Sequence, residues 1–153
     1  MRAAVQRVSR AEVRVEGEVT GRIGAGLLVL VGIGANDTPE LARTFAEKVM
    51  RLRIMDDGQE KMNKSLLETG GGILCISQFT LYGDARHGRR PSYRGAAAPA
   101  VAQPLYEAFV NGARALAAPR GIVVESGRFQ AMMDVDLVND GPVTVLLDTD
   151  KLF

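Results

Sequence analysis

Leu27-Leu28-Val29-Leu30-Val31-Gly32-Ile33 is a continuous apolar run, and further glycines stand close to both of its ends. An apolar run of this length without alternating polar residues is typical of a strand that is buried on both faces. Because both faces of such a strand must be covered, the run predicts a sheet that packs against other elements.

Two amphipathic segments can supply that cover. Thr38-Pro39-Glu40 provides an N-cap residue, a proline for the first helical position and an early acid, which together predict the start of a helix. Apolar residues follow at helical spacing, namely Leu41, Phe45, Val49 and Leu52. A second helix is predicted from about Ala100 to Ala117, where Pro119 and Gly121 end it. Its apolar face comprises Leu105, Phe109, Ala113 and Leu116.

The other patterned segments predict strands. Apolar and charged residues alternate from Ala11 to Val15 before Gly17, which predicts a hairpin. Strands are also predicted at Ile73 to Leu81, at Phe129 to Val138, where one face is expected to be buried, and at Val143 to Leu147. The expected fold is α/β, with a curled, barrel-like sheet, mostly antiparallel or mixed, packed against two main helices.

Composition limits what this fold can do. The 153 residues, 46% hydrophobic and 24% charged, suit a single domain over residues 1–153. With 19 basic and 18 acidic residues the net charge is +1, so nucleic acid can be contacted only by a local basic patch. The lone Cys75 is expected to be a buried, inert thiol. The polar start of the chain and the lack of a long apolar run predict a cytoplasmic protein without a membrane partner.

Two motifs carry the candidate chemistry: Ser77-Gln78-Phe79-Thr80-Leu81 and Asn139-Asp140-Gly141-Pro142-Val143-Thr144. Neither contains a histidine, a cysteine or a cluster of metal ligands, so no metal and no cofactor is expected. Both place small hydroxyl and amide groups beside backbone that a ligand can approach closely. On pattern alone, the first motif could be an edge strand with polar residues facing water, and Gly141-Pro142 could be an ordinary tight turn.

The two motifs, together with Gly88-Arg89-Arg90-Pro91-Ser92-Tyr93, Gly127-Arg128-Phe129 and the start Val5-Gln6-Arg7-Val8, resemble those of D-aminoacyl-tRNA deacylases. The resemblance covers essentially the whole chain. It implies a homodimeric hydrolase with that family's fold, which removes D-amino acids, and also glycine, from mischarged tRNA while rejecting L-amino acids. It also implies that Gly141-Pro142 is joined by a cis peptide bond and reaches across the dimer interface into the partner's site.

The resemblance divides the roles among the residues. The strand end that receives the adenosine and the ester carbonyl would comprise Ser77, Gln78, Phe79 and Thr80. Substrate binding and chiral selection would fall to Gly141 and Pro142 with their neighbours Asn139, Val143 and Thr144. If the carbonyls of Gly141 and Pro142 hold the substrate ammonium group, an L side chain would point into this backbone, and the missing Cβ of Gly141 would leave room for the ligand.

The chemistry needs little help from side chains. An aminoacyl ester is already activated, so a full catalytic triad is not obligatory. The backbone N–H groups of Phe79 and Thr80 are candidate donors to the developing oxyanion. Thr80 as a nucleophile would need a base, and the only histidine, His87, is interpreted as an exposed loop residue. We therefore expect attack by water, assisted by the ribose hydroxyl of the substrate.

The loop after the first motif is rich in arginine. Arg89, Arg90 and Arg94, with Tyr93 available for stacking, are predicted to contact the RNA 3′ end, although a solvated charged loop would show the same pattern. Two other functions remain open on the sequence. One is a hydrolase of small D-amino-acid esters or amides, and the other is a non-catalytic RNA-binding barrel.

Overall fold

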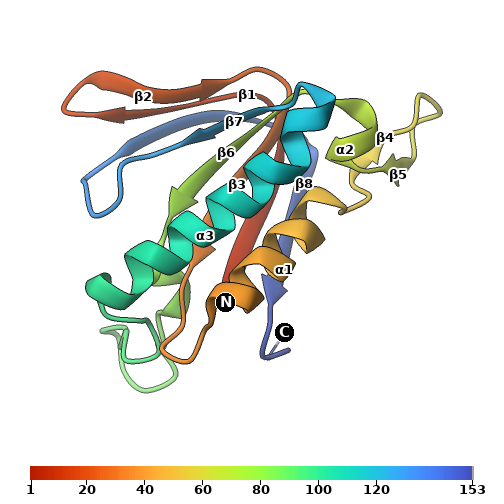
Figure 1. Cartoon of the computed structure of the whole chain (residues 1–153). Coiled ribbons are helices and arrows are strands. Elements are labelled where there is room, and N and C mark those ends of the chain that lie inside the picture. Colours follow the sequence, from red (N-terminus) through yellow and green to blue (C-terminus); the bar gives the residue numbers. More distant parts are fainter. Residues whose placement is uncertain (153) are drawn as a thin grey trace.

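The computed structural model describes residues 1–152, which form a mixed α/β fold. A strongly curled sheet is covered on one side by two long helices (Figure 1). Its strands are β1 (Arg2–Val15), β2 (Glu18–Ile23), β3 (Gly26–Gly32), β6 (Gly72–Ser77), β7 (Val123–Ser126) and β8 (Asp134–Asp148). The barrel-like architecture predicted from the sequence is confirmed.

The long strand β1 organises the sheet. It pairs antiparallel with β2, β3 and β8, whereas β6 runs parallel to both β3 and β7. The predicted hairpin between β1 and β2 turns at Glu16 and Gly17, which both have positive φ values, 52° and 82°. Such a turn matches the right-handed twist of the flanking strands. Because β2 and β7 also contact each other, the sheet curls nearly into a barrel.

Both predicted helices are present, as α1 (Pro39–Met50) and α3 (Pro99–Ala117). The hydroxyl of Thr38 caps α1 by accepting a hydrogen bond from the N–H of Leu41 at 3.2 Å. The two helices pack together, and the ring centroids of Phe45 and Phe109 lie 6.1 Å apart.

The apolar residues form two cores. The larger one lies between the helices and the sheet, and the smaller one fills the inside of the curled sheet around Val13, Leu28 and Leu74. Cys75 is fully buried as predicted, and burial raises the pKa of its thiol to about 12, which keeps it protonated and inert.

Several short elements have no counterpart in the sequence prediction: β4 (Met55–Asp56), β5 (Met62–Lys64), α2 (Leu66–Thr69) and the 3₁₀ turns η1 (Phe79–Tyr82) and η2 (Ala118–Arg120). Within the described part of the chain, no helix is long and apolar enough to cross a membrane.

The strand predicted from Ile73 to Leu81 is wrong at its end. The strand β6 stops at Ser77, and residues 79–82 turn into η1. The last ladder bond is donated by the N–H of Gln78 to the carbonyl of Val31 at 2.8 Å. Since β3 ends at Gly32, the chain has no partner strand to follow beyond this bond.

The strand predicted from Phe129 to Val138 is also partly wrong. It begins only at Asp134, because the preceding residues fold into a loop with a turn from Arg128 to Ala131. The φ value of Gln130 is 64°, which interrupts extended structure. The strand then continues as one element through Gly141-Pro142 to Asp148, so this dipeptide is not an ordinary tight turn between two strands.

Candidate functional site

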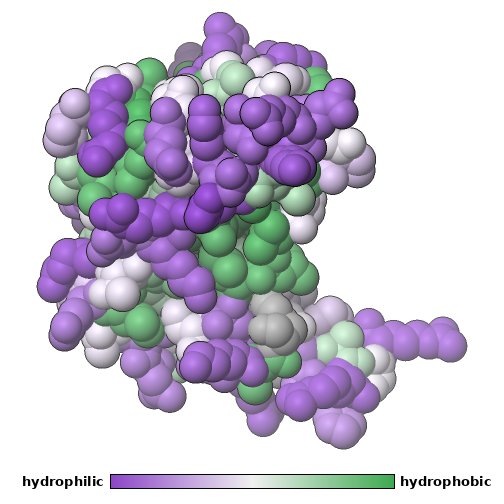
Figure 2. Space-filling model, turned by 90° about the vertical axis from the view of Figure 1, so that its right-hand side faces the viewer, coloured by the Kyte–Doolittle hydropathy of each residue, from purple (hydrophilic) through white to green (hydrophobic). Residues whose placement is uncertain are grey.

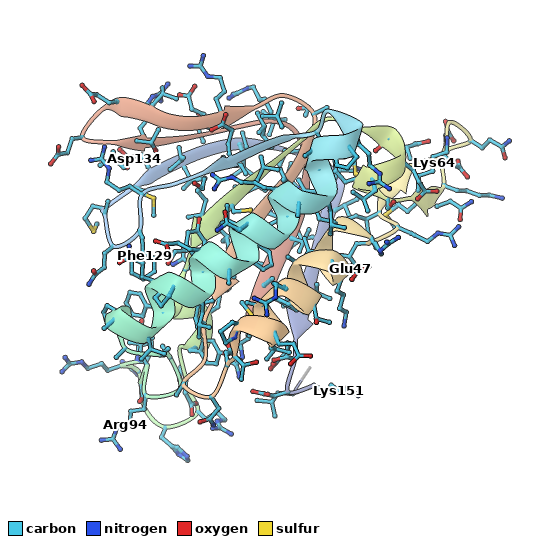
Figure 3. The ribbon with its side chains drawn as sticks, viewed as in Figure 1. Glu47, Lys64, Arg94, Phe129, Asp134 and Lys151 are labelled. Atoms are coloured by element: carbon cyan, nitrogen blue, oxygen red, sulfur yellow. The ribbon has the colours of Figure 1, made fainter. Side chains whose placement is uncertain are left out.

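A cavity of about 630 Å³ opens where β6 ends. Ser77, Gln78, Phe79 and Thr80 all line it. The opposite walls come from the loop before β8 and from the segment that leads into α3, and they consist mainly of apolar residues. In Figure 3, Phe129 lies on that loop, between β7 and β8, on the side of the sheet that carries α3. The first motif therefore contributes the polar part of an otherwise apolar pocket.

The backbone at this pocket offers free donors. The N–H groups of Phe79 and Thr80 donate to no acceptor within residues 1–152. They begin a 3₁₀ turn, and the first N–H groups of a helical turn have no partner inside it. Two adjacent, unpaired N–H groups at the edge of a cavity can bind an anion or a polarised carbonyl oxygen.

The hydroxyl of Thr80 accepts a hydrogen bond from the side-chain amide of Gln78. No histidine or carboxylate hydrogen-bonds to Thr80 in the part of the chain that the structure describes. The single histidine, His87, is exposed in the following loop, as predicted. This geometry favours an orienting role for Thr80, because an activated nucleophile requires a base within hydrogen-bonding reach.

The arginine-rich loop adjoins the pocket through its tyrosine. The rings of Tyr93 and Phe79 meet edge to face, with centroids 5.2 Å apart, and both residues line the cavity. Arg89, Arg90 and Arg94 are exposed, and Arg94 projects away from the body of the molecule in Figure 3.

The arginines of this loop differ in their partners. Arg86 is held by Asp84 at 2.7 Å, and its hydrogen bonds keep the pKa of that carboxyl well below its ordinary value. Over the described residues 1–152, Arg89, Arg90 and Arg94 have no side-chain partner. Three cations beside the pocket are thus uncompensated.

The second motif forms a wide bulge in β8. The register places Gln6 opposite Thr144 and Val8 opposite Asn139, so four residues of β8 face one residue of β1. The peptide bond between Gly141 and Pro142 is cis, as the resemblance implies, and both residues are exposed.

Side chains hold this bulge from both sides. The amide of Asn139 donates to the carbonyls of Arg7 and Val143 at 2.9 and 3.0 Å. The guanidinium of Arg7 donates to the carbonyls of Asp140 and Ile54 at 3.3 and 2.9 Å. Asn139 is therefore a bracing residue of the loop in this structure, and the side chain of Thr144 accepts a bond from Gln6 at 3.2 Å.

The glycine at position 141 is required by the chain itself. Its φ value is +130°, and a Cβ there would lie 2.8 Å from the backbone nitrogen of Val143. The missing Cβ therefore has a reason within the chain itself, independent of any ligand. An alanine at this position would strain the backbone in the absence of any substrate.

One chain does not bring the two motifs together. Arg2 of β1 bonds to Leu81 beside the first motif, whereas Arg7 of β1 bonds to Asp140 in the second. Arg7 follows Arg2 by five positions along the extended strand, a span of about 17 Å at about 3.4 Å per residue. The cavity beside the first motif is accordingly lined by no residue of the second motif.

Two features, one in the pocket and one beside it, were not predicted from the sequence. The loop from Phe129 to Met133 lines it, although its alternating pattern predicted a strand. Arg2 contacts Leu81 and Tyr82, the last two residues of η1, and no local signal in the sequence points to these contacts. Among the described residues, no three His, Cys, Asp or Glu side chains are grouped so that they could hold a metal ion.

Comparisons with known proteins place the chain in a family. A family model described as D-Tyr-tRNA(Tyr) deacylase matches residues 4–148. A protein named D-aminoacyl-tRNA deacylase from Symbiobacterium thermophilum is 55% identical over 100% of this chain and 99% of its own length. One of the same name from Koribacter versatilis is 56% identical over 100% of both chains.

Two solved structures share the fold. One, titled c-Myc DNA Unwinding Element Binding Protein, has a TM-score of 0.89 and 36% identity and covers 97% of this chain and 99% of its own. A probable eukaryotic D-amino acid tRNA deacylase has a TM-score of 0.82 over 95% and 97% of the two chains, and its 21% identity shows likeness of fold alone. The chain belongs to the D-aminoacyl-tRNA deacylase family. It is accordingly an enzyme, a hydrolase of that family.

Proposed function

We propose that this chain, acting as one domain, hydrolyses the ester bond that joins a D-amino acid to tRNA and rejects the L-aminoacyl form. Water adds to the ester carbonyl, the bond to the ribose oxygen breaks, and that oxygen leaves with a proton. The products are the free D-amino acid and tRNA. Glycyl-tRNA is proposed as a further substrate, because glycine has no side chain to be rejected.

One observation carries this proposal: the free N–H groups of Phe79 and Thr80 at the edge of the apolar cavity. Fixed donors aimed at a developing oxyanion are commonly the largest contribution to acyl transfer. The cavity has room for a nucleoside or an aromatic group, and Ser77 and Gln78 offer polar contacts to it. Within residues 1–152 no histidine or carboxylate hydrogen-bonds to Thr80, which supports attack by water with help from the ribose hydroxyl of the substrate.

Chiral selection is assigned to the backbone of Gly141 and Pro142, with Val143 and Thr144 beside them. Gly141, Pro142 and Thr144 are exposed, and none of these four residues lines the cavity of its own chain. We therefore assign them to the site of a second copy, in a homodimer. β8 offers exposed apolar side chains at Val138 and Leu146 for such a contact, and the face seen in Figure 2 carries an apolar patch between polar regions.

Arg89, Arg90 and Arg94 are assigned to the phosphates near the 3′ end of the tRNA. Their support is the lack of acidic partners and their place beside the cavity. Tyr93 contacts Phe79 edge to face at the same rim and is 38% exposed, which supports its assignment to stacking on a base.

The experiment compares D-Tyr-tRNA, L-Tyr-tRNA, glycyl-tRNA and a free D-tyrosine ester as substrates, with release of the amino acid as the readout. We expect rapid release from D-Tyr-tRNA and glycyl-tRNA and little from L-Tyr-tRNA. Equal release from the free ester would favour a hydrolase of small D-amino-acid esters. Binding of tRNA without release from any substrate would favour a non-catalytic RNA-binding barrel.

A further inference from the structure

Arg2 lies directly beneath the turn that carries the free donors. Its guanidinium donates to the carbonyl of Leu81 at 3.0 Å and to the carboxylate of Asp148 at 3.2 Å. The same group lies over the ring of Tyr82, 4.5 Å from its centroid. One planar cation thus contacts the last two residues of η1 and the end of β8.

The contacts of Arg2 are well shielded from water. Its side chain is 18% exposed, and that of Asp148 is fully buried. Charge-assisted hydrogen bonds of this kind are stronger and geometrically more defined than exposed ion pairs. The bracket formed by Arg2, Asp148, Leu81 and Tyr82, here called the Arg2 bracket, is therefore a firm support.

The supported turn is short enough to transmit that support. It is closed by hydrogen bonds from Leu81 to Gln78 at 3.3 Å and from Gly83 to Thr80 at 2.9 Å. The carbonyl held by Arg2 and the two free N–H groups belong to the same four-residue turn. A shift at its far end would redirect those donors.

Close packing of Tyr82 against three glycines holds the end of the turn in place. A Cβ at Gly34 would lie 2.5 Å from its hydroxyl oxygen, and a Cβ at Gly32 or Gly95 would lie 3.3 or 3.1 Å from its ring. Three glycines thus make the space for this ring, and the guanidinium of Arg2 lies over one of its faces.

We propose that Arg2 is a positioning residue for hydrolysis, which aims the N–H groups of Phe79 and Thr80 through the turn without touching the substrate. The inference rests on the proposed function of these donors. Small misplacements of fixed donors cost rate rather than affinity, because the donors act on charge that develops in the transition state.

The test variant is Arg2→Lys, which keeps the positive charge for Asp148. A single ammonium group cannot donate in a planar fork to Asp148 and Leu81 while it lies flat on Tyr82. The matched control is Arg10→Lys, since Arg10 also links β1 to β8, through Asp136, but has no contact with η1. A second variant, Tyr82→Leu, keeps the ion pair and removes the ring.

The measurements are kcat and KM for D-Tyr-tRNA together with the thermal unfolding midpoint. We expect Arg2→Lys and Tyr82→Leu to lower kcat by roughly tenfold or more, with KM little changed, whereas Arg10→Lys behaves like wild type. A wild-type kcat in either folded variant, or a change in KM alone, would overturn the positioning role. If the wild-type protein released no amino acid from D-Tyr-tRNA, the proposed function itself would fail instead.

Discussion

Two buried tyrosines differ in whether their hydroxyl groups have partners. The hydroxyl of Tyr106 donates to the carbonyl of Cys75 at 2.8 Å. The buried hydroxyl of Tyr82 has no hydrogen-bond partner in residues 1–152, and burial raises the pKa of both phenols. Because an unsatisfied buried polar group destabilises the folded state, the ring of Tyr82, rather than its hydroxyl, is what the fold needs.

Substitution of each tyrosine by phenylalanine should therefore affect the free energy of unfolding differently. Tyr82→Phe should leave the free energy of unfolding unchanged or raise it by about 1 kcal/mol, whereas Tyr106→Phe should lower it by about 1 kcal/mol. Urea denaturation of the two variants beside wild type measures both. A loss of stability in Tyr82→Phe equal to that in Tyr106→Phe would mean that the Tyr82 hydroxyl is satisfied after all.

At the scale of elements, the 3₁₀ turn η1 concentrates the candidate chemistry. Phe79 is its first residue, and Gln78, which precedes it, lies outside the helical region with φ and ψ of −142° and 83°. Proline is accepted at the first position of a helical turn and after a residue that is not helical, so it suits position 79, where it would remove the backbone N–H. The turn therefore permits a substitution that deletes one donor while the element is kept.

Phe79→Pro should reduce kcat for D-Tyr-tRNA by about a hundredfold or more, as expected for the loss of an oxyanion donor. Phe79→Ala controls for the missing ring and should lose much less activity.

Thr80→Ala should retain substantial activity for D-Tyr-tRNA, because we assign its hydroxyl only an orienting role. Accumulation of a covalent aminoacyl-enzyme in wild type, or a folded Thr80→Ala variant without activity, would instead identify Thr80 as the nucleophile.

The salt dependence of tRNA affinity tests whether the arginine loop binds RNA. Each phosphate contact with Arg89, Arg90 or Arg94 should release about 0.7 to 0.9 counterions. The triple alanine variant should therefore bind tRNA more weakly, with a flatter slope of log affinity against log salt. The control Asp84→Asn/Arg86→Gln neutralises a pair that already compensates itself and should keep the wild-type slope. Equal slopes in the triple variant and wild type would mean that the loop only faces solvent.

Elements with local signals were predictable from the sequence. The cap at Thr38, the proline at position 39 and the turn at Gly17 depend on neighbouring residues alone, and α1 and the β1–β2 hairpin are confirmed. The ends of β6 and β8 were not predictable, because they depend on tertiary context. β6 ends where its neighbour β3 ends. Residues 129–133 line a cavity, and their alternation of apolar and polar residues is the same as that of a strand with one buried face.

Residues of the first motif were predicted from the sequence to lie at one place, whereas the geometry around them was not. The motif Ser77 to Thr80 does line the pocket, and Gly141-Pro142 does have a cis peptide bond. The contacts of Arg2 with Leu81 and Asp148 join residues 79 and 146 positions apart. No pattern within a short window of sequence reports contacts of that range.

At the scale of the whole molecule, the separation of the two motifs makes complementation a test of the shared site. Phe79→Pro damages one motif and Gly141→Ala the other, so each homodimer should be impaired. In a mixed dimer one of the two sites combines the intact halves. Random exchange should thus restore about a quarter of wild-type activity. Native circular dichroism of each variant before mixing is required, and no recovery on mixing of two folded variants would argue against a site built from two chains.

The most direct measurement of the central claim is the ratio of single-turnover hydrolysis rates for D-Tyr-tRNA and L-Tyr-tRNA. Phe79→Pro, purified in the same way, reports any contaminating deacylase. The account predicts rapid hydrolysis of the D form by wild type, a ratio of about a hundred or more because the L side chain meets fixed backbone, and little activity in Phe79→Pro. Equal rates for the two forms, or equal activity in wild type and Phe79→Pro, would contradict it.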